Sequence, residues 1–368
     1  MQILIIYFLV FLCFTPCLLS ISISPCAKWN TTGLTIAGNG VQGIGANQLN
    51  YPQGIFIHDK IKRLYVSDTM NNRIQVFPLD RSTQTGLTVV SSVKTYYKIY
   101  VDDDNDDFPT IYAADNSDNR VEKWTKGATN GVQVGSRCLS CTGVWLDKDK
   151  NIYMSDHDRH CILKWSPLTN ITTTVAGELG VNGPSANQLN QPQGIFVDKT
   201  TSALYIADLL NHRVQKWPKN ALEGVTVAGS SDGNAGSDNA SLHRPYGLRV
   251  DEETKIVYVV DLMNNRIQRW KHGETEGDTI VGGYGEGNEN NQFHHPTDLA
   301  FDDDGNLYVS DAWNHRVQFF ALTDNRPCQA TLTTTVKTST GLVNSSMYKS
   351  PIALAIVFSI TWIIMKLL

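Results

Sequence analysis

Residues 68–77 read DTMNNRIQVF, and five near-copies of this stretch follow along the chain. They are DNSDNRVEKW from Asp115, DHDRHCILKW from Asp156, DLLNHRVQKW from Asp208, DLMNNRIQRW from Asp261 and DAWNHRVQFF from Asp311. The leading aspartates are about 50 residues apart, and a repeat of that length is typical of a solenoid, a propeller or a similar array. The secondary structure expected inside one unit decides among these architectures.

The fourth unit contains four short β-rich runs. They span residues 194–198, 204–208, 213–217 and 224–229, with polar turns between them. No unit shows the periodicity of a helix, and four short antiparallel strands per unit are typical of a propeller blade. We therefore predict an all-β fold, a six-bladed β-propeller of four-stranded antiparallel blades that spans residues 23–328.

The sixth unit lacks a strand, so closing the ring requires one from elsewhere. Only three β-rich runs follow Pro296, whereas GLTIAG at 33–38 resembles the fourth strand of other units, such as TTVAG at 173–177. We expect this N-terminal strand to complete the last blade. Cys26 precedes that strand and Cys328 follows the last blade, so we predict a Cys26–Cys328 disulfide that fastens the closure.

Three further cysteines, Cys138, Cys141 and Cys161, fall in the third unit. An exported chain would oxidise most of its cysteines. Two of the three are expected to pair, and the third is expected to stay free or to bind another chain. The sequence does not choose among the three possible pairings.

The repeated pattern resembles a known family. A P-x-G followed by a hydrophobic run, then LYV-[SA]-D and N-[NH]-R-[IV]-Q-x-[WF], is similar to the NHL repeat and can be followed from Leu49 to Phe320. Unit 2 departs from it, with no P-x-G and a longer acidic turn within residues 96–110, and unit 3 has HDRHC where others have Asn and Arg. The resemblance implies a six-bladed propeller. Cytoplasmic members of the family carry RING and coiled-coil segments or bind RNA, and we do not extend those roles to this sequence.

The two ends differ from the middle of the chain. Residues 1–22 hold an apolar, uncharged run followed by small residues, which predicts a signal peptide, although the missing basic residue leaves an uncleaved anchor as the alternative. Residues 329–350 form a Thr/Ser-rich stalk and residues 351–368 an apolar tail. This order predicts a GPI-attachment signal, with Asn344 as the lipid-anchor site and Gly341 as the other reasonable site, or alternatively a transmembrane tail. In either case we expect an extracellular protein anchored to the cell-surface membrane.

Charge and sequons narrow the class of partner. The net charge is −5 and the sequence pI is about 6.0, so there is no basic excess to neutralise phosphates and we expect no nucleic-acid partner. Sequons at Asn30, Asn170 and Asn239 predict glycosylation, in agreement with export.

The residues found in nearly every unit are best explained as structural, because one active site needs its residues only once. We expect the Asp68 carboxylate to accept hydrogen bonds from backbone N–H groups of the following turn. Asn72 should take a left-handed backbone, and Arg73 should donate to backbone or carboxylate groups at the blade edge. His212 and His315 replace the turn Asn and should have the same structural role.

Function should lie where the units differ, and three regions qualify. The first is the set of long Gly- and Asn-rich connections between units, which should emerge on one face of the ring. The second is the middle of the innermost strand, where aromatic residues could narrow the channel or simply pack between blades. The third is the set of histidines His243, His294 and His295 on neighbouring blades, which are candidate zinc ligands. The aromatic positions are Phe56, Tyr100, Trp145 and Phe196. The candidate binding residues are Tyr51, Gln193, His243, Arg244, Tyr246, Arg249, His294 and His295.

We expect a monomeric binding module that takes an extracellular protein or a glycan on its loop-rich face and needs no cofactor. The alternative is a metal-dependent extracellular enzyme. It would resemble the amidating lyase that cleaves peptidyl-hydroxyglycine with a histidine-held zinc, or a lactonase-like hydrolase, and would carry zinc or calcium. Zinc needs three or four ligands that converge on one point. Adjacent residues of a strand point to opposite sides, so only one of His294 and His295 is expected to ligate easily.

Overall fold

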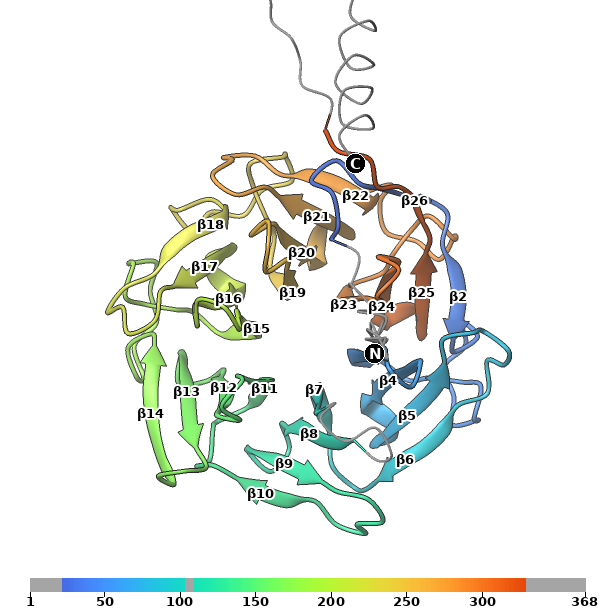
Figure 1. The fold of residues 1–368 in the computed structure, drawn as a ribbon, viewed down its shortest axis with the longest axis horizontal. Coiled ribbons are helices and arrows are strands. Elements are labelled where there is room, and N and C mark those ends of the chain that lie inside the picture. The colour runs from blue at the N-terminus through green and yellow to red at the C-terminus, as the bar shows by residue number, and fades with distance from the viewer. Residues whose placement is uncertain (1–21, 103–108, 329–368) are drawn as a thin grey trace, which may run out of the picture. The chain divides into compact units, whose positions relative to one another are not determined.

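The computed structural model describes residues 22–102 and 109–328. Within these ranges, six four-stranded antiparallel sheets surround a central axis as the blades of a propeller, which confirms the predicted fold class (Figure 1). No helix in the described ranges is long and apolar enough to cross a membrane. The stalk, the apolar tail with Asn344, and all of the predicted signal peptide except Ser22 lie outside the described residues.

Each blade runs from an innermost strand at the channel to an outermost strand at the rim. Blade 1 is β3 (Pro52–His58), β4 (Arg63–Asp68), β5 (Arg73–Pro78) and β6 (Leu87–Ser91). Blade 2 is β7 (Tyr96–Asp102), β8 (Thr110–Asp115), β9 (Arg120–Trp124) and β10 (Val132–Val134). Blade 3 is β11 (Cys141–Leu146), β12 (Ile152–Asp156), β13 (Cys161–Ser166) and β14 (Ile171–Ala176). Blade 4 is β15 (Pro192–Val197), β16 (Leu204–Asp208), β17 (Arg213–Trp217) and β18 (Val225–Gly229).

The last two blades include the closure of the ring. Blade 5 is β19 (Pro245–Val250), β20 (Val257–Asp261), β21 (Arg266–Trp270) and β22 (Asp278–Gly282). Blade 6 is β23 (Pro296–Phe301), β24 (Leu307–Asp311), β25 (Arg316–Phe320) and, at the rim, β2 (Leu34–Ala37). Short 3-10 turns join the second and third strands of four blades: η1 (Thr69–Asn71), η2 (Leu209–Asn211), η3 (Leu262–Asn264) and η4 (Ala312–Asn314).

The N-terminal strand closes the ring as predicted. β2 pairs antiparallel with β25, with Leu34 opposite Phe319, and the two segments lie side by side in Figure 1 although they come from opposite ends of the described chain. A second pair, β1 (Lys28–Trp29) with β26 (Leu322–Asp324), extends the contact. The predicted Cys26–Cys328 disulfide is present beside it and joins residues 302 positions apart. The closure therefore combines backbone pairing with a covalent link.

The structure also resolves the choice among the blade 3 cysteines. Cys138 and Cys141 form a disulfide, and Cys161 is free and buried. Burial raises the pKa of the Cys161 thiol to about 12. Because the thiolate is the reactive form, burial and the raised pKa both disfavour reaction at this cysteine.

Glycine at the third position of the innermost strand lets neighbouring blades approach closely. A Cβ on Gly143 would lie 2.3 Å from the carbonyl oxygen of Gln193, and one on Gly194 would lie 2.6 Å from that of Tyr246. Backbone atoms cannot move aside as a flexible side chain can. The G of the P-x-G pattern is therefore needed for blade packing around the channel.

The repeated aspartate has a different role from the predicted one in the regular blades. In blade 4, Asp208 accepts hydrogen bonds from the backbone N–H of Asn190 (2.6 Å) and from Nε of Arg213 (2.9 Å). Arg213 in turn donates to the carbonyl oxygens of Pro184 and Gln188, at 2.6 and 3.1 Å. The carboxylate thus fastens the connection that enters the blade, and the expected bond to the turn backbone was wrong for this blade. The Arg prediction, donation to backbone and carboxylate, is confirmed.

The turn bond does occur in the two blades that depart from the pattern. Asp115 accepts from the Asp118 N–H at 3.1 Å, and Asp156 accepts from the Arg159 N–H at 3.2 Å. Both turns lack the 3-10 geometry of the other four. The two kinds of blade therefore use the same carboxylate in different ways.

The left-handed residue of each turn links one blade to the next. Asn72, His212 and His315 have φ values of 55°, 53° and 52°, as predicted for the turn Asn and its histidine replacements. Nδ1 of His212 accepts from the Arg244 N–H at 3.1 Å, and Nδ1 of His315 accepts from the Tyr51 N–H at 3.3 Å. The structural role predicted for these two histidines is confirmed, and each contact crosses a blade boundary.

Candidate functional site

The ring has two ends that differ in shape and chemistry. We call the end where the long connections enter the innermost strands the loop face, and the opposite end, where the first two strands of each blade join, the hairpin face. A cavity of about 410 Å³ opens on the hairpin face. It is lined by the C-terminal halves of the innermost strands and by the hairpins that follow them. We call this cavity the hairpin cup.

Aromatic side chains form one wall of the hairpin cup. Four aromatic residues predicted to face the channel pack in a row: Phe56, Tyr100, Trp145 and Phe196. The centroids of successive rings are 5.2, 5.2 and 4.8 Å apart. The first three line the cup directly. The sequence left two roles open for these rings, packing between blades or lining the channel. Both apply, because the rings pack between neighbouring blades and also narrow the channel.

Arg249 is the cationic group of the hairpin cup. Its guanidinium lies 5.1 Å from the centre of the Trp145 ring and donates to the carbonyl oxygen of Leu248 at 2.9 Å. Nη1 is also 3.8 Å from a carboxylate oxygen of Asp298. Burial lowers the pKa of Arg249, but a guanidinium stays charged at any physiological pH. Arg249 is thus a fixed positive charge beside aromatic faces.

A buried ion pair crosses the channel on the loop-face side of Arg249, and the sequence analysis missed it. Lys98 and Asp298 occupy the third position of their innermost strands, where the other four blades have glycine. Lys98 Nζ is 2.9 Å from Asp298 Oδ1 and donates to the carbonyl oxygen of Thr297 at 2.6 Å. Burial lowers the pKa of Lys98 to about 8. The sequence contained a sign of this pair, because the two units that lack the glycine carry a lysine and an aspartate in its place.

The rim of the hairpin cup is acidic. Carboxylates come from the hairpins of three blades, with one lysine among them: Asp59, Lys199, Asp251, Glu252, Asp302 and Asp303. Burial raises the pKa of Asp59 to about 6, against the backbone hydrogen bond that it accepts from Asp303. Asp251 and Asp302 accept backbone hydrogen bonds within their own turns, at 2.7 and 2.8 Å for the shorter bond of each.

The predicted loop-face residues do not form one site. Gln193 and Tyr246 lie within β15 and β19, only 4% and 8% exposed, and not in the connections as expected. Arg244 is exposed, and His243 packs against His212 with ring centroids 5.4 Å apart. Tyr51 packs edge-on against Trp313 at 5.4 Å. Tyr51, His243, Arg244, His294 and His295 lie in the connections on the loop face, outside the strands.

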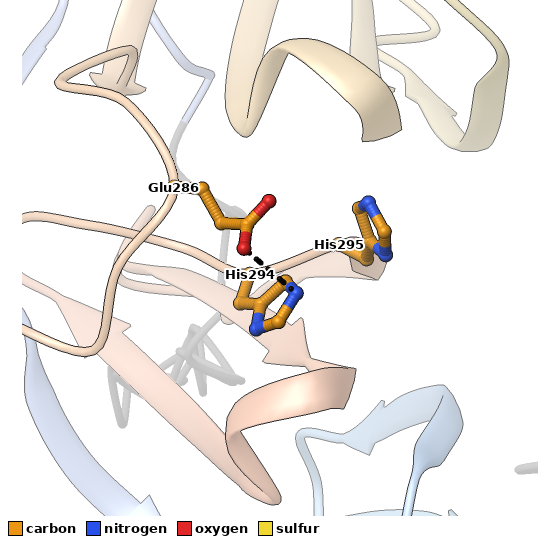
Figure 2. A group of neighbouring side chains, drawn as sticks. All are labelled: Glu286, His294 and His295. Atoms are coloured by element: carbon orange, nitrogen blue, oxygen red, sulfur yellow. Dashed lines mark ion pairs between the residues drawn. The ribbon is translucent and has the colours of Figure 1, made fainter.

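His294 and His295 converge with Glu286, which the sequence analysis did not predict. Figure 2 shows the Glu286 carboxylate and the His294 imidazole joined by an ion pair, with His295 beside them. One donor atom from each residue lies within 4.8 Å of the others, and His294 Nε2 is 3.2 Å from Glu286 Oε1. The expectation that adjacent histidines point apart was wrong, because His295 has a left-handed backbone (φ 49°) just before β23 and is not part of the strand.

The repeat itself can be compared with known families. Residues 293–320, which contain His294, His295 and the turn of blade 6, match the family described as NHL repeat. This match covers one repeat, and the described residues form a six-bladed propeller around it.

Individual proteins resemble this chain only over part of its length or at low identity. NHL repeat-containing protein 2 of Gallus gallus is 32% identical over 93 residues, which is 24% of this chain and 13% of the chicken protein. An auxiliary nutrient binding protein of Bacteroides thetaiotaomicron shares the fold with a TM-score of 0.64 and 14% identity, over 81% of this chain and 78% of that one. A gluconolactonase of Xanthomonas campestris has a TM-score of 0.58 and 12% identity, over 82% and 91%. These structures establish a shared fold, and the chicken protein is matched over a small part of its length.

Proposed function

We propose that this propeller is a binding module that acts outside the cell, and that the hairpin cup takes a sugar unit of a glycan. The observation that carries the proposal is the cup itself, an aromatic wall facing Arg249 inside an acidic rim. A sugar ring offers C–H faces that pack on aromatic rings and hydroxyls that exchange hydrogen bonds with guanidinium and carboxylate groups. A concave, mostly apolar pocket with a few convergent polar groups is the usual form of a small-ligand site.

Several features support the extracellular part of the proposal. Two disulfides lie within the described residues, and disulfides persist in oxidising compartments. The predicted glycosylation sites Asn30, Asn170 and Asn239 are all exposed. Membrane attachment through the apolar tail, at Asn344 or as a membrane span, belongs to the same proposal. The fold neighbour from Bacteroides thetaiotaomicron is an auxiliary nutrient binding protein, which is compatible with a propeller that holds a small polar ligand.

The loop face keeps a separate role in this proposal, as a surface for an extracellular protein partner. Arg244 is its exposed charge among the predicted residues. The metal-dependent enzyme, lyase-like or lactonase-like, stays the alternative. One observation favours it, the convergence of Glu286, His294 and His295, but that cluster is on the loop face and away from the hairpin cup.

A glycan array followed by titration tests the cup. The purified full chain would be applied to immobilised glycans, and the best ligand would be titrated against wild type, Trp145→Leu, Arg249→Met and Arg244→Ala. We expect Trp145→Leu and Arg249→Met each to weaken binding at least about tenfold, since an aromatic or charged hydrogen-bonding contact contributes about 1–3 kcal/mol. Arg244→Ala should bind like wild type. If instead Arg244→Ala loses binding and Trp145→Leu keeps it, the ligand binds the loop face and the cup proposal is wrong.

A further inference from the structure

The Glu286, His294 and His295 cluster occupies positions that every regular blade repeats. The position of Glu286 is held by Asn182 in blade 4, because both residues form an isolated parallel bridge to the same loop position, Phe293 and Leu189 respectively. His294 corresponds to Asn190, since each donates its backbone N–H to the aspartate of its blade.

The second histidine follows the same equivalence. His295 corresponds to Gln191, and both are left-handed, with φ values of 49° and 55°. Blade 4 therefore builds the same loop with Asn, Asn and Gln, and blade 1 uses Gln42, Asn50 and Tyr51 at these places. Two imidazoles and a carboxylate are not needed for the fold, and they occur together in blade 6 alone among the four regular blades.

We propose that Glu286, His294 and His295 form a binding site for a late transition-metal dication, zinc foremost. Two imidazole nitrogens and one carboxylate oxygen are borderline donors that suit zinc and copper(II), whereas calcium and magnesium prefer all-oxygen sites. Three protein donors leave one tetrahedral position open for water or for a group of a partner. The site lies on the loop face, so it is independent of the sugar-binding proposal for the hairpin cup.

The distances fit a small dication. Bonds of about 2.0–2.1 Å in a tetrahedron place neighbouring donors about 3.3 Å apart. His294 Nε2 and Glu286 Oε1 are 3.2 Å apart, and one donor atom from each of the three residues lies within 4.8 Å of the others. The Glu286 side chain is 57% exposed. We expect side-chain rotation to close the remaining gap when the ion binds.

The backbone around the cluster is already fixed. The His294 N–H donates to Asp311 at 2.8 Å and the His295 N–H to Asn265 at 2.9 Å. Trp313 packs against both imidazoles, with ring centroids 4.9 and 4.8 Å away. Because these contacts hold the rings together without a metal, an ion would meet a preorganised pair of ligands.

Metal titration of the full chain tests the site. The protein, purified in mild detergent and stripped with a chelator that is then removed, would be titrated with Zn²⁺ by calorimetry. The copper(II) complex would be examined by electron paramagnetic resonance. We expect one equivalent of Zn²⁺ to bind, millimolar Ca²⁺ not to displace it, and the copper spectrum to show coupling to two imidazole nitrogens.

Blade 4 supplies the matched variant. Glu286→Asn, His294→Asn and His295→Gln combined give blade 6 the residues that already build this loop in blade 4, so the fold should be kept. This variant should lose the site, and His295→Gln alone should bind zinc at least about tenfold more weakly, because even partners that only support a ligand cost about 10–100-fold. His272→Gln, an exposed histidine on the hairpin side, is the control and should bind as wild type. Equal zinc binding by wild type and the triple variant, or no binding by wild type, would show that Glu286 and His294 form only an ion pair.

Discussion

At the scale of single residues, Lys98 and Asp298 show how a repeat acquires a singular feature. The third position of the innermost strand is glycine in four blades, because the next blade approaches closely there. In blades 2 and 6 the position carries opposite charges that are 7% and 2% exposed. Removing two charges from water is costly, so the pair is weak evidence for stability. The pair lies beside Arg249, whose Nη1 is 3.8 Å from Asp298.

The buried ammonium should make stability depend on pH in a defined direction. Burial lowers the pKa of Lys98 from 10.5 to about 8. Between these values the unfolded chain still holds a proton that the folded chain has released, so the free energy of unfolding should rise with pH through this window. We expect the stability of wild type relative to Lys98→Met to increase from about pH 7 to about pH 10, measured by urea unfolding. A difference that stays constant or falls would mean that Lys98 keeps its ordinary pKa in the folded protein.

At the scale of elements, each regular blade is held to the connection before it by an Arg–Asp pair. Arg213 is 2% exposed, and it joins Asp208 to the carbonyl groups of the loop that enters β15. Corresponding pairs are Arg73 with Asp68, Arg266 with Asp261 and Arg316 with Asp311. The pairs explain why the repeated phrase keeps Asp and Arg five residues apart. They connect a strand end to the loop that enters the same blade.

Breaking one of these pairs should destabilise the whole ring. Arg213→Gln leaves the Asp208 carboxylate buried without its cation, and loss of one partner of a buried pair costs about 3–5 kcal/mol. Denaturant unfolding would measure the loss. Arg326→Gln, which removes an exposed ion pair with Asp324, is the matched control and should change stability by less than about 1 kcal/mol. If both variants lowered the free energy of unfolding by less than about 1 kcal/mol, the Arg213–Asp208 pair would not stabilise blade 4, and apolar packing would account for its stability.

At the scale of the whole ring, closure depends on segments from the two ends of the described chain. β2 pairs with β25, β1 pairs with β26, and the Cys26–Cys328 disulfide joins the two segments. Side chains also contribute, since the Ser24 hydroxyl donates to the carbonyl oxygen of Arg326 at 2.8 Å. Opening any propeller blade from the ring exposes its neighbours, so the closing blade controls the stability of all six.

Removing this disulfide should lower the stability of the entire propeller. For Cys26→Ser combined with Cys328→Ser, we expect a loss of about 2–5 kcal/mol in a single unfolding transition, since the link constrains a very long loop in the unfolded chain. Thermal unfolding followed by circular dichroism measures it. The Cys138–Cys141 disulfide joins residues only 3 positions apart, so removing it with Cys138→Ser and Cys141→Ser should cost less stability. An early, separate transition confined to blade 6 would instead show that the blades unfold independently.

The sequence by itself determined the repeat, the strand content, the number of blades, the closing strand and the Cys26–Cys328 pair. These follow from local pattern and from the need of each blade to bury both faces, so no long-range geometry was required. It also placed Phe56, Tyr100, Trp145, Phe196 and Arg249 at one level of the channel, because repeats align by register. Lys98 and Asp298, which replace the repeated glycine in blades 2 and 6, could have been found in the same way but were missed.

Only the tertiary structure decided what depends on contacts between blades and on backbone conformation. It paired Cys138 with Cys141, placed the cavity on the hairpin face, and buried Gln193 and Tyr246 within strands. It also turned His294 and His295 to the same side, since a left-handed residue before β23 reverses the alternation that a strand would impose. Pattern along the chain fixes which residues share an element, but the direction of a side chain at a turn is set by hydrogen bonds to a neighbouring blade.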